Sequence, residues 1–256
     1  MEDLSELLRY LQRRRGAKRI AIVGHSTGCQ VIVHFMATAD EELRRIVQLA
    51  VLQAPVSDRE AAEGSGVGPE VVTTARRHVD AGEGETLVHS LYGIAPLSAQ
   101  RTVDLFERMG KDDMFSSDLS SAELSARLQH MAAVPTMLAL SMADEYVPCA
   151  KQPGEYSALG VRMAAAAEAE VLELADADHA LSKPAAASKR FVHEVSARLG
   201  AISRGETLRP APQAAALEPE PVLAAHRQER GLAATRAASI AQLQASMGGR
   251  DSWDFF

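Results

Sequence analysis

The chain has 256 residues, is 46% hydrophobic and carries a formal net charge of -7 at pH 7. This length can bury a sizeable core, and the acidic balance offers no basic excess for nucleic acid. No apolar run approaches the length of a membrane span, and the acidic first residues are not a signal peptide. We therefore expect a soluble, cytoplasmic protein without a nucleic-acid partner or a membrane span.

A short motif near the start of the chain carries the first chemical signal. A predicted helix over residues 3–14 leads into a β-branched strand over 19–23, then into Gly24-His25-Ser26-Thr27-Gly28 and a helix over 29–39. A strand, Gly-x-Ser-x-Gly and a helix together are typical of a nucleophile elbow, which presents a serine hydroxyl at a sharp turn. Glycine is expected on both sides of the serine because such a turn leaves no room for a Cβ. By itself a serine between glycines is more often an ordinary turn residue.

The middle of the chain predicts a cap. After a buried strand over 46–53, residues 58–130 show helical and glycine-punctuated pieces with no strand signal. We expect a helical cap that shapes a pocket, with a plain surface excursion as the alternative. Asp112, Asp113 and Asp118 suggest a metal site only if they converge, so we expect them to cap helices or to be solvated.

Two later strands end in residues that would complete a catalytic site. A strand over 134–141 ends just before Asp144, and a strand over 170–174 ends before His179, which precedes a last amphipathic helix. Serine, then an acid, then histidine is the chain order of α/β-hydrolases. We therefore predict Ser26 as nucleophile, Asp144 as acid and His179 as base.

Each assignment has rivals in the sequence. Glu145, Asp176 and Asp178 lie close to the predicted acid or base, but the side chain of Asp178 should diverge from its neighbour His179. His25 lies inside the elbow, where it is expected to pack beside the site. The remaining histidines lack a matching position after a strand: His34, His78, His89, His130, His193 and His226.

These residues resemble a family of α/β-hydrolases from fungi, plants and algae that was long grouped as a domain of unknown function and includes a fungal siderophore esterase. The resemblance covers about residues 1–200 and rests on segments 24–30, 112–119, 141–148 and 177–179. It implies an α/β-hydrolase fold with a mostly parallel sheet and hydrolysis of an ester or related acyl bond. It also implies that Thr27 offers one backbone amide to an oxyanion hole.

The position of the elbow creates an expectation about the sheet. An α/β-hydrolase has several strands before its elbow, whereas Ser26 comes early in this chain. We expect the early strands to be lacking, through an incomplete gene model, an alternative start or a true fragment. The strand over 19–23 would then be an uncovered edge prone to self-association, and one oxyanion donor would be absent. Loss of such a donor typically lowers turnover about 100- to 1000-fold.

The composition of the chain also predicts its domain boundaries and gives no sign of a cofactor. Residues 1–204 are predicted to form the partial hydrolase domain, and residues 205–256 a proline-containing linker, a short helix and an extended C-terminal tail. Cys29 and Cys149 form no metal-ligand spacing and are expected to be small buried hydrophobic residues. No cofactor or metal is predicted.

Three functions fit these residues. The first is a serine hydrolase that acts on a small-molecule ester or acyl substrate. The second is a peptidase or thioesterase, because the same triad serves all acyl transfer. The third is a catalytically impaired fragment that binds a small molecule or a protein.

Overall fold

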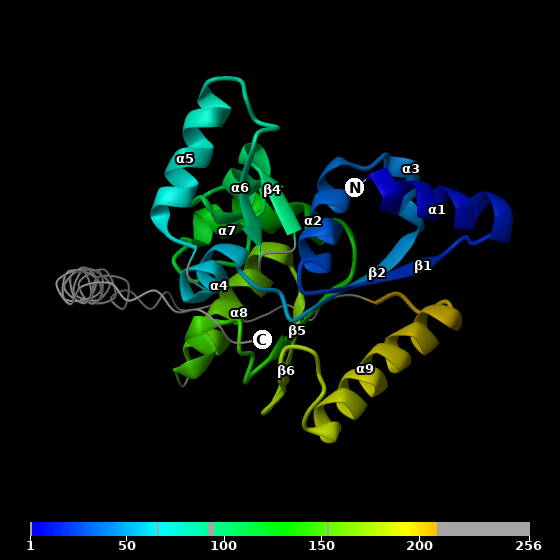
Figure 1. The fold of residues 1–256 in the computed structure, drawn as a ribbon. Coiled ribbons are helices and arrows are strands. Elements are labelled where there is room, and N and C mark those ends of the chain that lie inside the picture. The colour runs from blue at the N-terminus through cyan, green and yellow to red at the C-terminus, as the bar shows by residue number, and fades with distance from the viewer. Residues whose placement is uncertain (1, 66, 92–94, 153, 209–256) are drawn as a thin grey trace, which may run out of the picture. The chain divides into compact units, whose positions relative to one another are not determined.

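The computed structural model describes residues 2–65, 67–91, 95–152 and 154–208 (Figure 1). The chain divides into two units, Met1–Ala216 and Leu217–Phe256, and the described residues belong to the first. The predicted tail, its short helix and the linker beyond Leu208 lie outside the described residues. The sheet strands are β1 (Ile20–His25), β2 (Val47–Gln53), β5 (Thr136–Ser141) and β6 (Glu170–Leu174). The helices are α1 (Glu2–Arg15), α2 (Gly28–Thr38), α3 (Glu41–Ile46), α4 (Asp58–Ser65), α5 (Pro69–Asp80), α6 (Ala99–Phe106), α7 (Ser121–Leu128), η1 (Gln129–Ala133), η2 (Pro148–Lys151), α8 (Glu155–Ala167) and α9 (Ala185–Ser203).

Four parallel strands form the sheet, in the order β1-β2-β5-β6. Their register pairs His25 with Gln53, Gln53 with Ala139, and Ser141 with Leu174. The carboxyl ends of neighbouring strands therefore meet at one edge of the sheet, which is where ligands bind in parallel α/β folds. The elbow between β1 and α2 lies at this edge, and the predicted α/β-hydrolase fold is confirmed.

Helices cover both faces of the sheet, as parallel strands require. One face packs on α9 through Leu49, Met137 and the helix residues Ala187 and Phe191. The opposite face packs on α1, α2, α7 and α8, and this larger core includes the fully buried Phe35. Figure 1 shows α1 and α2 on one side of the sheet and α9 on the other.

Strand β1 is an edge strand, as predicted. In the described sheet it pairs with β2 alone. Val23 in this strand leaves 53% of its surface exposed, while Ile22 is buried. Among the described residues, no strand pairs with the outer side of β1.

The cap contains a hairpin that the sequence analysis did not predict. Strands β3 (Leu87–Leu91) and β4 (Ala95–Ser98) pair in antiparallel fashion within residues 58–130. Val88 packs on α5 and α6, whereas Leu87 is 66% exposed. The cap is therefore helical, as expected, with one added hairpin whose strands show no clear alternation of buried and exposed residues.

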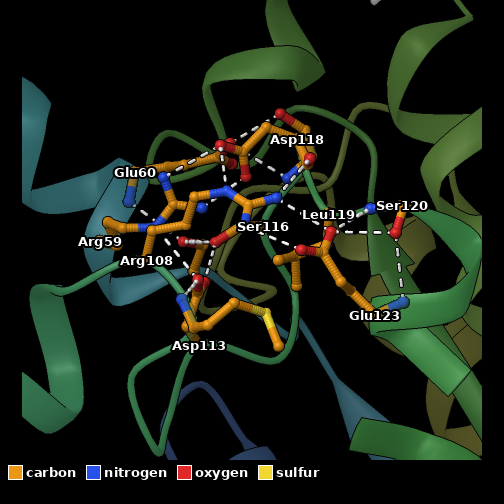
Figure 2. Close-up of polar contacts among 12 residues, drawn as sticks. Arg59, Glu60, Arg108, Asp113, Ser116, Asp118, Leu119, Ser120 and Glu123 are labelled. Atoms are coloured by element: carbon orange, nitrogen blue, oxygen red, sulfur yellow. Dashed lines mark hydrogen bonds and ion pairs between the residues drawn. The ribbon is translucent and has the colours of Figure 1, made fainter. Parts of the chain in front are cut away.

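Buried ion pairs attach the cap segment that follows α6 to helix α4. Arg59 donates to Asp113 at 3.2 Å and to Asp118 at 2.5 Å, and Figure 2 shows these groups surrounding the arginine. Asp113 has a fully buried side chain and Arg59 is 8% exposed. We expected Asp112, Asp113 and Asp118 to be solvated or to cap helices. This was wrong for Asp112 and Asp113, which are both buried. A buried carboxylate needs a cation or several hydrogen-bond donors.

Further hydrogen bonds from hydroxyl and backbone groups extend this cluster. The hydroxyls of Ser57 and Ser116 lie 2.5 Å apart, and Ser116 also donates to Asp113. The carboxylate of Glu60 accepts from the backbone N–H of Ser117 at 3.0 Å and from its hydroxyl at 2.7 Å. These contacts join α4 to the later part of the cap, and the Ser57–Ser116 contact ties the cap to the segment that follows β2.

Candidate active site

The elbow between β1 and α2 holds Ser26 in a strained backbone conformation. Its φ is 55°, in the left-handed region that non-glycine residues rarely adopt. Its backbone N–H donates to the carbonyl of Gln53 at 3.1 Å, which ties the turn to β2. A non-glycine residue held in such a conformation is typical of functional turns, because the surrounding structure must compensate for the strain.

Glycines flank Ser26 at positions 24 and 28, and only Gly24 lies where a Cβ would clash with neighbouring atoms. A Cβ on Gly24 would lie 2.5 Å from the carbonyl oxygen of Gly28, which no side chain can accommodate. A Cβ on Gly28 itself would meet nothing within 4 Å. The expectation that both glycines are needed was therefore wrong for Gly28, whose α-carbon faces open space at the start of α2.

The loops after β5 and β6 bring Asp144 and His179 together. Nδ1 of His179 lies 2.8 Å from Oδ2 of Asp144, and both residues are buried. The other oxygen of Asp144 accepts the backbone N–H of Tyr146 at 2.9 Å. With the carboxylate accepting at Nδ1, the neutral imidazole carries its proton there and leaves Nε2 as a base.

The rival carboxylates contact other groups. Asp178 accepts from the backbone N–H of Ser182 at 2.7 Å and from its hydroxyl, and this hydrogen bonding lowers the pKa of Asp178. Glu145 accepts the backbone N–H of His179 at 3.0 Å, which lowers the pKa of Glu145. Asp178 therefore shapes a turn, and Glu145 holds the backbone beside the imidazole.

Two aromatic rings enclose the imidazole of His179. The ring of His25 lies 4.7 Å from it between centroids, and the ring of Tyr146 lies 4.8 Å away in an edge-on arrangement. Nδ1 of His25 also lies 2.5 Å from Oε1 of Gln53, a contact that holds the His25 ring beside the ring of His179. Among the hydrogen bonds of the described residues, none joins the Ser26 hydroxyl to His179, a contact that is often long before substrate binds.

A cavity of about 350 Å³ opens between α2 and the cap beside the elbow. Its wall on the α2 side begins with Thr27, and its cap side includes Asp58, Arg101 and Lys111. Burial raises the pKa of Asp58 to about 6, against the opposing charge of Arg101, while Asp112 raises it further. The lining is thus polar and holds a carboxyl group that titrates near neutral pH.

His34 and Asp112 form a partly buried contact at this cavity that was not predicted from the sequence. Nε2 of His34 lies 2.5 Å from Oδ1 of Asp112, and Arg101 pairs with the other oxygen. Hydrogen bonding from His34 and the charge of Arg101 lower the pKa of Asp112 against the desolvation that would raise it. The sequence holds no local signal for this contact, because the histidine and the aspartate lie 78 residues apart.

Cys29 and Cys149 are buried free thiols, as predicted, and burial raises the pKa of Cys149 to about 12. Within the described ranges, no group of three or more His, Cys, Asp or Glu side chains is arranged to hold a metal ion. None of the described helices has both the length and the apolar character needed to cross a membrane.

Comparison with known proteins identifies curated relatives. A UPF0613 protein of Schizosaccharomyces pombe is 31% identical over 166 residues, covering 57% of this chain and 52% of that protein. The fusarinine C esterase sidJ of Aspergillus fumigatus is 30% identical over 199 residues, covering 57% of this chain and 56% of that protein. The chain spans about half the length of the curated relatives it matches.

Solved structures and a family model also match. An α/β-hydrolase fold protein of unknown function is 17% identical with a TM-score of 0.48, covering 78% of this chain and 71% of that one. The esterase domain of a Rhodothermus marinus protein is 19% identical with a TM-score of 0.44, covering 81% and 69%. The family model described as "Protein of unknown function (DUF1749)" matches residues 1–199, so the chain belongs to the DUF1749 family.

Proposed function

We propose that this chain carries the catalytic groups of a serine hydrolase that cleaves an ester or related acyl bond. Ser26 is the nucleophile, His179 the general base and Asp144 the acid. The observation that carries the proposal is the 2.8 Å contact between Nδ1 of His179 and Asp144, at the same edge of the sheet as the strained Ser26 turn. The fusarinine C esterase among the relatives supports an ester as substrate.

The chemistry follows from these positions. Oγ of Ser26 attacks the acyl carbon while its proton passes to Nε2 of His179, and Asp144 stabilises the imidazolium that forms. The backbone N–H of Thr27 donates to the developing oxyanion. His179 then gives the proton to the leaving alcohol, and water hydrolyses the acyl group from Ser26 by the same route in reverse. The cavity that begins at Thr27 is the proposed binding space for part of the substrate.

A fluorophosphonate probe tests the nucleophile, because such a reagent reacts readily only with a serine activated by a base. We expect the 256-residue chain to be labelled at Ser26. Ser26→Ala should abolish labelling, while Ser121→Ala, at an exposed serine that begins α7, should leave it unchanged. Labelling that persists in Ser26→Ala would overturn the proposal.

The same probe ranks the acids. Asp144→Asn should slow labelling on the order of a thousandfold or more, because an uncharged amide fixes the wrong imidazole tautomer. Asp178→Asn should change the rate only a few-fold, since Asp178 contacts Ser182. The opposite ranking would assign the acid to Asp178.

The alternative function is a binding module without turnover. The exposed edge of β1 favours it, because an unpaired strand can accept a strand from another protein. A correctly folded chain in which no serine reacts with the probe would favour this alternative. The shape of the pocket decides between ester, thioester and peptide substrates. The cytoplasmic location stays a prediction.

A further inference from the structure

Gln53, at the carboxyl end of the interior strand β2, contacts three segments of the candidate site. Its side-chain Nε2 donates to the hydroxyl of Ser141 and to the backbone carbonyl of His179, both at 3.2 Å. Its Oε1 lies 2.5 Å from Nδ1 of His25. Gln53 is 4% exposed, so these hydrogen bonds form away from water, where they are strongest.

These contacts fix the orientation of the Gln53 amide. A backbone carbonyl only accepts, so the group that faces the carbonyl of His179 is the NH₂ group. The carbonyl Oε1 then faces His25 and also only accepts, so Nδ1 of His25 carries a proton and donates it. Gln53 thereby selects one tautomer of the ring that packs 4.7 Å from the imidazole of His179.

The backbone of Gln53 holds the nucleophile turn. Its carbonyl accepts the N–H of Ser26 at 3.1 Å and the thiol of Cys29 at 3.3 Å. One residue thus hydrogen-bonds both the elbow and the loop of His179, although Gln53 and His179 are 126 residues apart in sequence.

We propose that Gln53 is a positioning residue, which sets the distance and orientation between Ser26 and His179 through a single buried amide. The proposal rests on the proposed hydrolase function for its effect on rate. The physical reason is that attack and proton transfer require near-contact geometry, and a misplacement of about 1 Å costs about 100-fold in rate. Ser141, whose hydroxyl accepts from Gln53, links the strand of the acid to the same amide.

The test replaces the amide while keeping the length of the side chain. In Gln53→Met the second-order rate of fluorophosphonate labelling should fall about 100-fold. The matched control is Gln48→Met on the same strand, since Gln48 donates to the carbonyl of Arg45 at 2.9 Å and not to the site. Gln48→Met should label at the wild-type rate.

A second readout reports the contact itself and needs no activity. Long-range ¹H–¹⁵N spectra of the imidazoles, recorded at pH 8.5, should show His25 as the Nδ1–H tautomer in the wild type and lose this signature in Gln53→Met. If Gln53→Met does not fold, Gln53→Glu decides, because it keeps an acceptor for His25 but offers no donor to the carbonyl of His179. That variant should keep the tautomer and still label slowly.

The outcomes separate this proposal from the hydrolase assignment. If no variant labels, the hydrolase function fails, and the tautomer of His25 alone decides whether Gln53 fixes the ring. An unchanged tautomer in a folded Gln53→Met would overturn the role of Gln53. Wild-type labelling rates in both folded Gln53 variants would overturn it as well, with the nucleophile assignment left intact.

Discussion

At the scale of single residues, Asp58 links pH to stability. Its pKa is raised to about 6 mainly by burial, whereas an aspartate in an unfolded chain titrates near 4. The native state therefore binds more protons between about pH 4 and pH 6, so the contribution of Asp58 to stability falls as pH rises through this window. Asp58→Asn should increase the free energy of unfolding at pH 7.5 by an amount on the order of 1–3 kcal/mol, seen as a higher melting temperature, and the gain should vanish near pH 4.

Asparagine keeps an acceptor for the amide of Gln30, which donates to Asp58 at 2.8 Å. The control is a carboxyl group whose pKa is shifted the other way: hydrogen bonds from Ser182 lower the pKa of Asp178, so its ionised form stabilises the folded protein. Asp178→Asn should slightly lower the melting temperature at pH 7.5. A gain for Asp58→Asn that is equal at pH 4 and pH 7.5 would contradict the burial of a charged carboxylate.

At the scale of elements, the junction of β1 and α2 depends on Gly24 but not on Gly28. Gly24→Ala places its Cβ 2.5 Å from a backbone oxygen, so the elbow must open, and we expect a loss of several kcal/mol or failure to fold. Gly28→Ala meets no atom within 4 Å at the first residue of α2, where alanine is the better helix former by up to about 1 kcal/mol. Urea unfolding of both variants measures the difference. A destabilised Gly28→Ala would show that another group occupies this space.

At the scale of the whole molecule, the free edge of β1 should govern association. Unpaired strand edges with apolar side chains recruit other strands, and charged residues oppose this. We expect the chain to elute above its monomer size at high concentration, and Val23→Lys to shift it towards the monomer. Val192→Lys on α9 is the matched control, since its valine is 59% exposed and that of Val23 is 53%. A wild-type chain that remains monomeric at all concentrations would remove the edge as an interface.

Local patterns were enough to locate the main elements and several candidate residues. The strand of residues 170–174 was predicted with its observed bounds, and the helix and strand around Ser26 were predicted to within two residues. Strand periodicity and turn chemistry depend on neighbours in sequence, so they can be read without a structure. Helix α3 and the cap hairpin were missed, because α3 consists largely of charged residues and β4 contains Pro96, so neither shows the apolar pattern of its class.

The sequence by itself determined which segments form the parallel strands, and that Ser26, Asp144 and His179 each follow a strand. Only the tertiary structure decided that Asp144 is the carboxylate at the ring of His179, that Gln53 joins the Ser26 turn to the loop of His179, and that Arg59 neutralises a buried Asp113. The physical reason is that these contacts join residues 35 to 126 positions apart. Strand register and the energetic cost of burying an unpaired polar group determine which residues form these contacts. Both act only in the packed chain.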